Sequence, residues 1–304
     1  MPLDWYICGF VPSRFAPPSR TRPDWKHRKE KRVYTQRLAY GLPVTGPTDA
    51  PAIVPKGAEV LLETRLPYLD IDQRREVLRS TAIRSGHALV DDVEGWGRLN
   101  LYAAADGFGV FDTDVTVTMD QSLGGFAAKD VWRNDIGGVG KLTKQGTGEL
   151  DLAGENYYRG GTAIDDGVLV AASENALGRG GVSVNGGALI DFAPVLLHVG
   201  GNYTQSSKGT LKMTLGRCHD GVSRGALLAD GNVKLSGHLQ VSFQGPTPSN
   251  TSIPLIFFKG VRSGAFDDLV VTGLSGYSYS LSYGPRSVSL TVLRPNDSRR
   301  HTRD

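Results

Sequence analysis

Short apolar runs that alternate with polar residues recur through the middle of the chain, with glycine-rich turns between them. Leu150 and Leu152 flank Asp151, and Val182 and Val184 flank Ser183, so each run can bury one face. The turns contain Gly146, Gly148, Gly154, Gly160, Gly161, Gly167, Gly178, Gly180, Gly181, Gly186 and Gly187. Glycine at this density allows a turn with positive φ every few residues. The pattern predicts a chain that winds coil upon coil around a narrow apolar core, rather than a two-layer sandwich.

The preceding segment, residues 35–112, has a mixed or α-helical pattern. Residues 57–82 predict a helical stretch in which Asp70 and Gln73 form a capping pair, and Val77 and Leu78 face inward. A second short helix is predicted further on, with Gly107 as its C-terminal stop. In that helix the residues expected on one face are Leu99, Tyr102 and Ala105.

From residue 113 to 294 the pattern is that of strands, beginning with Val115 and Val117. After Phe192 the strands lengthen. Their inward residues are expected to be Leu211, Met213, Leu215, Val233, Leu235, Leu239, Val241, Phe243, Val288, Leu290 and Val292. Near the end of the chain, Phe266 is expected to turn into a closing cap, and Tyr283–Gly284 to open the last hairpin. Residues 1–34 and 295–304 lack periodicity and are predicted to be disordered flanks.

The segment 132–192 resembles the autotransporter-associated β-strand repeat, which occurs in passenger domains exported across Gram-negative outer membranes. The matching residues are Gly140–Lys144, Gly146–Gly148, Leu150, Leu152, Gly154, Asn156–Tyr158, Gly160–Thr162, Gly167, Leu169–Val170 and Ala176–Gly178. The resemblance implies a right-handed parallel β-helix whose closing rungs lie in the C-terminal part. Folding is expected to start at these rungs and to proceed coil by coil. It also implies a secreted or cell-surface location, associated with the outer membrane through a translocator whose strands this sequence does not show.

Residues 35–112 are similar to the region that follows the catalytic core in bacterial acid phosphatases of the type 2 phosphatidic acid phosphatase family. That family holds phosphate with one lysine and two arginines, and uses two histidines with an aspartate. Here Ser85–His87 resembles one of its motifs, but Arg84 stands where proline is expected. In the second motif, Ser19–Arg20 is followed by His27 one residue too late, and Lys31 replaces the aspartate. The interpretation is therefore that His87 is a loop histidine.

Pairs of carboxylates are the other candidate chemistry. They are Asp91, Asp92 and Glu94; Asp112 and Asp114; Asp165 and Asp166; Asp267 and Asp268. Carbohydrate-active β-helices carry acids on successive coils, so cleavage that depends on Asp165 or Asp166 is one hypothesis. Adjacent aspartates beside glycine also occupy turns, where they accept backbone N–H groups, and this interpretation is favoured. The histidines His198, His219, His238 and His301 show no metal spacing. We predict no catalytic, cofactor-binding or metal-ligating residues, and no cofactor.

Composition adds few constraints. The 304 residues include 39 glycines and carry a formal net charge of +3, with basic residues concentrated at 20–37 and 299–303. These basic runs are interpreted as solvated flanks rather than nucleic-acid sites. Cys8 and Cys218 form no disulfide or metal motif. Residues 5–11 are too short for the apolar core of a signal peptide, so no signal peptide is expected.

The sequence therefore predicts a non-enzymatic passenger segment with an adhesion or spacer role. The expected partners are host or surface macromolecules or polysaccharide, and not nucleic acid. The alternative is the C-terminal remnant of an autotransporter-linked acid phosphatase whose catalytic core is missing from this chain.

Overall fold

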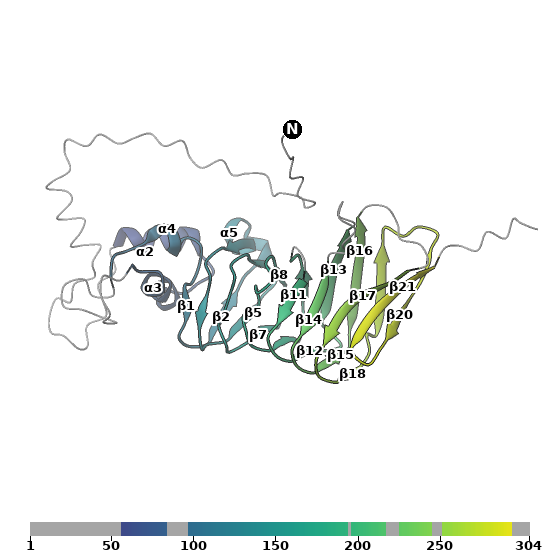
Figure 1. Cartoon of the computed structure of the whole chain (residues 1–304). Helices are drawn as coiled ribbons and strands as arrows, with labels where there is room; N and C mark the ends of the chain where they lie inside the picture. Colours follow the sequence, from purple (N-terminus) through teal and green to yellow (C-terminus); the bar gives the residue numbers. More distant parts are fainter. Residues whose placement is uncertain (1–55, 84–96, 194–195, 217–224, 245–250, 294–304) are drawn as a thin grey trace, which may run out of the picture.

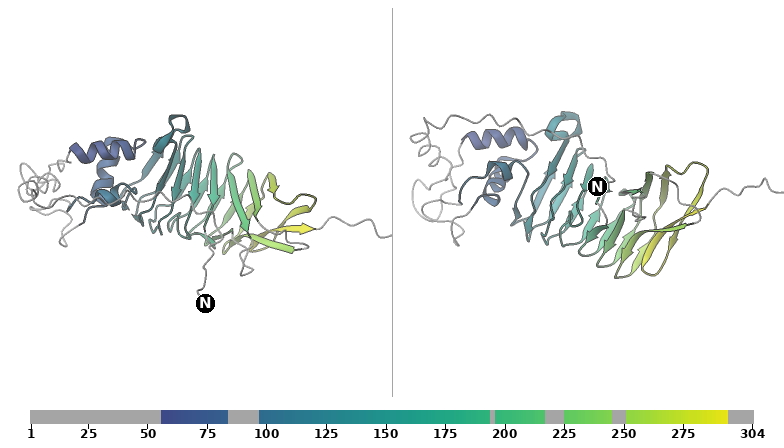
Figure 2. Two further views of the ribbon diagram at one scale, coloured as in Figure 1. Left: turned by 90° about the horizontal axis from the view of Figure 1, so that it is seen from above. Right: turned by 45° about the horizontal axis from the view of Figure 1, so that its top comes forward.

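The protein is a stack of β coils with helices at one end, as Figure 1 shows. The structure is a computed structural model that describes residues 56–83, 97–193, 196–216, 225–244 and 251–293. Seen from above and tilted forward, the strands follow one another along a single long axis (Figure 2). The predicted mainly-β fold of stacked parallel coils is confirmed, and its right-handedness stays a prediction.

Two long parallel sheets form the first and second faces of the stack. The first face contains β2 (Val115–Thr118), β5 (Leu142–Gln145), β7 (Thr162–Ile164), β9 (Val182–Val184), β12 (Tyr203–Gln205), β15 (Val233–Leu235) and β18 (Arg262–Gly264). The second face contains β3 (Lys129–Trp132), β6 (Glu149–Leu152), β8 (Val168–Ala171), β10 (Ala188–Asp191), β13 (Thr210–Gly216), β16 (His238–Gln244) and β19 (Asp268–Thr272). Each strand pairs with its counterpart one coil away, so every coil contributes one strand to each of these faces.

The third face is less regular. It starts with the parallel pair β1 (Val110–Phe111) and β4 (Gly137–Gly138), just before the boundary predicted at residue 113. It ends in the sheet β11 (Leu196–Val199), β14 (Ala226–Ala229), β17 (Thr251–Phe258), β21 (Ser287–Leu293) and β20 (Ser278–Tyr283). Between these two sheets the coils are joined by loop hydrogen bonds, for example from the Arg179 N–H to the Tyr158 carbonyl at 2.8 Å.

Coil length changes along the stack. In the early coils, register partners are spaced 20 residues apart, as shown by the bond between Asn156 and the Ile136 N–H. In the late coils the spacing is 30 and then 29 residues. The Asn232 N–H donates to the side chain of Asn202, and the Val261 N–H donates to the side chain of Asn232. We call the coils from β5 to β10 the short coils, and those from β12 to β19 the long coils.

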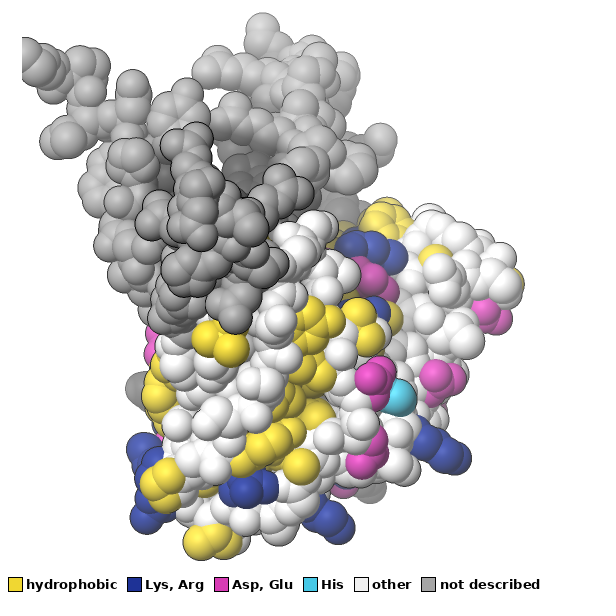
Figure 3. Space-filling model, turned by 90° about the vertical axis from the view of Figure 1, so that its right-hand side faces the viewer, with side chains coloured by type: hydrophobic (Ala, Val, Ile, Leu, Met, Phe, Trp, Pro, Cys, Tyr) yellow, Lys and Arg dark blue, Asp and Glu magenta, His cyan; other side chains and the backbone are white. Residues whose placement is uncertain are grey.

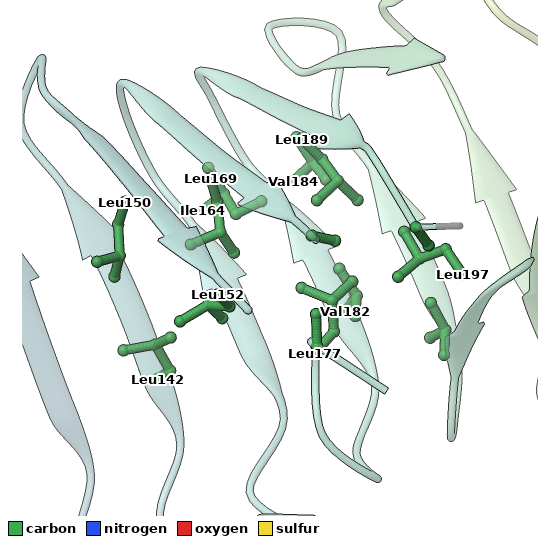
Figure 4. Packing of buried hydrophobic residues seen from close by; sticks show 14 of the residues in the cluster. Leu142, Leu150, Leu152, Ile164, Leu169, Leu177, Val182, Val184, Leu189 and Leu197 are labelled. Atoms are coloured by element: carbon green, nitrogen blue, oxygen red, sulfur yellow. The ribbon is translucent and has the colours of Figure 1, made fainter. Parts of the chain in front are cut away.

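The core is a column of aliphatic side chains that runs through the coils. Figure 4 shows Leu142, Leu150, Leu152 and Ile164 pointing into the space between the two long sheets, next to Leu169, Val182, Val184 and Leu189. The inward residues predicted for the long strands also belong to the core, with Phe243 only partly buried. The column forms one continuous core with the buried residues of the helices and the third face, and its burial stabilises the stack.

The glycines of the short coils have two different roles. Gly146, Gly161, Gly167, Gly178 and Gly187 have positive φ, as predicted. The other glycines of the set have no positive φ and serve a different purpose. Gly154 shows why glycine is needed at such places: a Cβ there would lie 1.9 Å from the Asn134 carbonyl oxygen of the preceding coil. The backbones of neighbouring coils approach too closely at the corners to accommodate a side chain.

The helices cover the N-terminal end of the stack. They are α2 (Lys56–Arg65), α3 (Ile71–Ser80), α4 (Leu101–Ala104), the 3-10 helix η1 (Gln121–Leu123) and α5 (Gly125–Ala128). The Asp70–Gln73 capping box is confirmed, and Val77 and Leu78 are buried. The face predicted for the next helix was wrong, because α4 is a single turn in which Tyr102 is 85% exposed and Ala104 is buried.

A buried polar network attaches the helices to the first coil. Asp130 of β3 is 3% exposed and accepts bonds from Arg65 and from the Tyr68 hydroxyl, both at 2.5 Å. Tyr68 in turn accepts the indole N–H of Trp132 at 2.8 Å. The pKa of Tyr68 is raised well above its ordinary value by burial and by Asp130. Because a buried ion pair is costly to break, this network fixes the helices as a cap on the stack.

An antiparallel hairpin closes the third face at the other end. β20 pairs with β21, which pairs with β17, and the Gly284 N–H donates to the Ser287 carbonyl at 2.8 Å. The predicted last hairpin at Tyr283–Gly284 is confirmed. Phe266 lies between β18 and β19, partly buried, with its N–H 3.2 Å from the Tyr283 hydroxyl. None of the described helices is both long enough and apolar enough to span a membrane.

Candidate functional site: the polar ladder of the third face

The aspartate pair nominated from the sequence occupies a corner between the first and second faces. Asp165 accepts bonds from the side-chain amides of Asn185, at 2.8 Å, and Gln145, at 3.1 Å, each 20 residues away. These bonds lower the pKa of Asp165. Asp166 accepts the Gly167 N–H at 2.7 Å. Asp166 therefore has the turn contact that the favoured interpretation predicts, whereas Asp165 links three successive coils through side-chain amides.

The remaining described pairs have similar partners. Asp112 pairs with Arg79, and Asp114 accepts the Lys141 N–H at 2.9 Å. Asp267 accepts the Gly237 N–H at 2.5 Å, and Asp268 lies 3.5 Å from His238. Asp112 thus contacts helix α3, and the other three aspartates contact neighbouring coils.

Several nominated residues lie outside the described residues. They are His27, His87, Asp91, Asp92, Glu94, His219 and His301, together with both cysteines. The predictions made for them are untested. Within the described part of the chain, no three side chains of His, Cys, Asp or Glu gather closely enough to hold a metal ion.

Polar side chains from five successive coils meet along the third face, and we call them the third-face ladder: Glu155, Asn175, His198, Asp230 and Lys259. The Glu155 carboxylate accepts the Asn175 side-chain amide at 3.0 Å, and Asn175 Oδ1 lies 3.3 Å from His198 Nδ1. On its other side, His198 Nε2 lies 3.0 Å from Asp230 Oδ2, and Lys259 Nζ lies 2.7 Å from Asp230 Oδ1. The ladder is a continuous run of hydrogen bonds along the stack axis.

The ladder contains a histidine–aspartate pair whose contacts are with other ladder residues. The hydrogen bonds from Lys259 and then from His198 lower the pKa of Asp230, so this carboxylate remains charged. Both ring nitrogens of His198 already have partners. Within the described residues, no serine, threonine or cysteine side chain bonds to the ring, so the pair has no nucleophile to activate.

The sequence pattern did not reveal the ladder. His198 was set aside because its spacing to other histidines fits no metal motif. The spacing along the ladder begins at 20 residues and then becomes 23 and 32, because the coils lengthen. A search of the sequence with a fixed period of 20 residues therefore misses the partners of His198. The strand pairing in the structure is needed to identify them.

A second charged cluster lies on the outer side of the second face. Lys129 pairs with Glu149 and lies 3.6 Å from Asp151. Burial raises the pKa of Asp151 to about 6, against the opposing effect of Lys129. An acid with such a pKa can transfer protons near neutral pH. A substrate of Asp151 would have to reach the carboxyl group from solvent, past the ion pair of Lys129 and Glu149. We therefore assign no reaction to this cluster.

Polar side chains inside the stack serve the fold. Asn156 is 2% exposed, accepts the Ile136 N–H at 2.8 Å and donates to the Ala176 carbonyl at 2.6 Å. Lys144 is fully buried and donates to the carbonyls of Gln145 and Gly146 at 2.8 and 2.9 Å. Burial lowers the pKa of Lys144 to about 8. These side chains provide hydrogen bonds to buried backbone N–H and carbonyl groups, which apolar core residues cannot do.

Comparison with known proteins gives this architecture a family context. Residues 142–171, which include most of the short coils, match the family described as passenger-associated-transport-repeat. The chain is 30% identical over 225 residues to the Neisserial autotransporter lipoprotein NalP of Neisseria meningitidis serogroup B, covering 65% of this chain and 19% of that protein. It is 33% identical over 144 residues to an extracellular serine protease of Serratia marcescens, covering 37% of this chain and 14% of the relative.

A third relative is the adhesin BmaC autotransporter of Brucella suis biovar 1, 37% identical over 87 residues, which covers 26% of this chain and 2% of the adhesin. The chain thus spans less than a fifth of the length of each of these relatives. The predicted autotransporter passenger segment is confirmed at this level. These relatives lend no support to the acid-phosphatase resemblance of residues 35–112, which stays a prediction.

Proposed function

We propose that this autotransporter passenger segment is a non-enzymatic, secreted or surface-exposed stalk, which serves in adhesion or as a spacer. The observation that carries the proposal is the hydrogen bonding of its polar side chains from coil to coil, as in the third-face ladder. Side chains paired in this way stiffen the stack, and their polar groups bond to one another rather than to a substrate. The names of the relatives support the location, since they include an autotransporter lipoprotein, an extracellular protease and an adhesin.

The shape of the molecule supports the same role. Each coil pairs with its two neighbours, so the stack gains length with each added coil while the aliphatic column fills the space between the two long sheets (Figure 4). The C-terminal end, seen in Figure 3, shows apolar side chains in a band between charged residues. Partly buried residues packed on the core at this end include Phe266, Leu269, Leu281 and Tyr283. A spacer of this kind holds whatever adjoins it at a fixed distance from its anchor.

The test is to assay the purified chain for turnover and for binding side by side. We expect no hydrolysis of p-nitrophenyl phosphate, casein or soluble polysaccharide. Saturable binding of the labelled chain to epithelial cells or to immobilised polysaccharide supports adhesion, and its absence supports a spacer. Hydrolysis that is lost in His198→Asn or His87→Ala, with folding unchanged by circular dichroism, would overturn the non-enzymatic proposal.

The second candidate, a remnant of an acid phosphatase, has one feature in its favour. The helical segment resembles the region after the catalytic core of that family, and here it caps the first coil through Asp130. Turnover of p-nitrophenyl phosphate dependent on His87 would support this candidate. The incomplete phosphate-binding motifs predict that none will be found.

A further inference from the structure

Asp191, the last residue of β10, places a carboxyl group inside the coil stack. It is 2% exposed and pairs in register with Ala171 on one side and Met213 on the other. The same column continues through Leu152 to Trp132 in the earlier coils. Its neighbours in sequence, Leu189 and Leu197, both lie in the aliphatic core, as Figure 4 shows. An acid therefore occupies a position where these other coils place an apolar side chain.

Only half of this carboxyl group has a partner. Asp191 Oδ1 accepts the Ala193 N–H at 3.1 Å, whereas Oδ2 is buried without a hydrogen bond to any described residue. No described lysine, arginine or histidine forms an ion pair with it. An ionised carboxylate in such a site loses its hydration without compensation.

The titratable group that faces Asp191 from the first face is Tyr203, and it does not provide the missing bond. Its hydroxyl donates to Gln205 Oε1 at 2.8 Å, while the Gln205 amide nitrogen is held by the carbonyls of Gly209 and His238. The pKa of Tyr203 is raised by burial and then by the charge of Asp191. Tyr203 therefore stays neutral beside Asp191 and gives it no compensating charge, and burial raises the pKa of Asp191 to about 7, against the bond from the Ala193 N–H.

We propose that Asp191 is a pH-sensitive weak point of the stack, whose ionisation loosens the rung at β10 and separates the short coils from the long ones. The location favours this role. β10 pairs with β8 of the short coils on one side and with β13 of the long coils on the other, so it joins the two regions. When protonated, the carboxyl group is tolerated inside the stack. When ionised, it favours states in which the rung opens to water.

The direction of the pH dependence follows from linkage. The native pKa lies above the unfolded value of about 3.9, so Asp191 lowers stability as pH rises between the two. Below the unfolded pKa the group has no net effect, and above the native pKa the destabilisation is complete. Between pH 5 and 8 this group alone should raise the unfolding equilibrium constant on the order of 10-fold to 100-fold.

The experiment compares urea unfolding of the whole chain at pH 5 and pH 8 for the wild type, Asp191→Asn and Asp151→Asn. Between pH 5 and pH 8 the unfolding equilibrium constant should rise less in Asp191→Asn than in the wild type, by a factor on the order of 10 to 100. Asp151→Asn is the matched control, because it removes an outer acid of raised pKa while Asp191 and its effect remain. If Asp191→Asn shows the same pH dependence as the wild type, the proposal is wrong.

A second measurement does not require the Asp191 variant to fold. In Asp151→Asn, infrared spectroscopy should detect a protonated carboxyl group that persists to about pH 7, and limited proteolysis should cleave near β10 faster at pH 8 than at pH 5. A carboxyl band already lost at pH 5, or cleavage near β10 that does not change with pH, would overturn the weak-point proposal.

Discussion

The short and long coils reach the same architecture by different means. In the short coils, strands of three or four residues alternate with corners where glycine lets neighbouring backbones touch, and the spacing remains at 20 residues. In the long coils, β13 and β16 have seven residues each, the third face gains its own strands, and the spacing grows to 29 or 30. Corner glycines approach neighbouring backbones closely in both regions, as at Gly154 and Gly237, so the length of the strands is what distinguishes the long coils.

This difference explains where each region tolerates change. A short strand makes few ladder hydrogen bonds, so the corners and the aliphatic column must fix its register. A seven-residue strand fixes its own register through pairing, and its corners can vary in length. We therefore expect changes of corner length to be tolerated better in the long coils, whereas filling a tightly packed corner glycine, such as Gly154 or Gly237, is costly in both regions.

The largest effect is expected where the helical cap meets the first coil. Trp132→Ala removes a fully buried indole that packs on Phe108, with ring centroids 5.4 Å apart, and donates to Tyr68. We expect a loss of about 3–5 kcal/mol in the free energy of unfolding, measured by urea denaturation. Tyr102→Ala, at an 85% exposed position in the same region, is the control and should change stability by less than about 0.5 kcal/mol. Equal losses for the two variants would show that the cap is not anchored through Trp132.

The second prediction compares the same substitution at a tight corner of the short coils and at the end of a long strand. Gly154→Ala places a Cβ 1.9 Å from the Asn134 carbonyl oxygen, so the corner must move, and we expect a loss of about 1–3 kcal/mol. At Gly216, in the long coils, the nearest atom to an added Cβ is 3.7 Å away. Gly216→Ala should therefore be neutral or slightly stabilising in thermal unfolding. Equal costs for the two alanines would show that close backbone contact at Gly154 does not limit stability.

A third prediction concerns the buried cross-coil amide of the short coils. Asn156→Leu leaves the Ile136 N–H and the Ala176 carbonyl without the partners they now have at 2.8 and 2.6 Å. Two unsatisfied buried groups should cost about 1–3 kcal/mol in urea unfolding, even though leucine restores apolar contacts. The control Tyr157→Leu changes the adjacent side chain, which is 46% exposed, and should have little effect. A neutral Asn156→Leu would show that water replaces the amide.

The sequence predicted the short coils in more detail than any other region. Leu150, Leu152, Val182 and Val184 alternate with polar residues in a fixed period, so their inward direction follows from the pattern alone. The roles of the glycines followed only in part, because the approach of Gly154 to Asn134 depends on which coils are neighbours. The periodic sequence therefore predicts which residues face inward. The close contacts between coils also depend on the register in which the coils stack.

The candidate site could not be predicted in the same way. His198, Asp230 and Lys259 become neighbours only because coils of unequal length are aligned by strand pairing. The cap contact is equally remote, since Asp130 and Arg65 are 65 residues apart. Asp191 fits the alternation of β10 as an inward residue, yet its charge conflicts with that position. Local pattern cannot resolve such a conflict, because the answer depends on the partners that the other coils supply.

The smallest effect is expected at an outer ladder of the short coils, and it carries a pH signature. Asp165 accepts bonds from Asn185 and Gln145, which lower its pKa, so its stabilisation is present above the unfolded pKa of about 3.9 and is lost as pH falls through the native value. Because the group is exposed, Asp165→Ala should cost only about 0.5 kcal/mol at pH 7, and less at pH 2. Urea unfolding at the two pH values checks this, with Asp166→Ala as the neighbouring control that keeps the cross-coil bonds. A larger cost at pH 2 than at pH 7 would mean that the ladder acts through packing and not through its charge. The outer contacts of the short coils would then resemble those of their core.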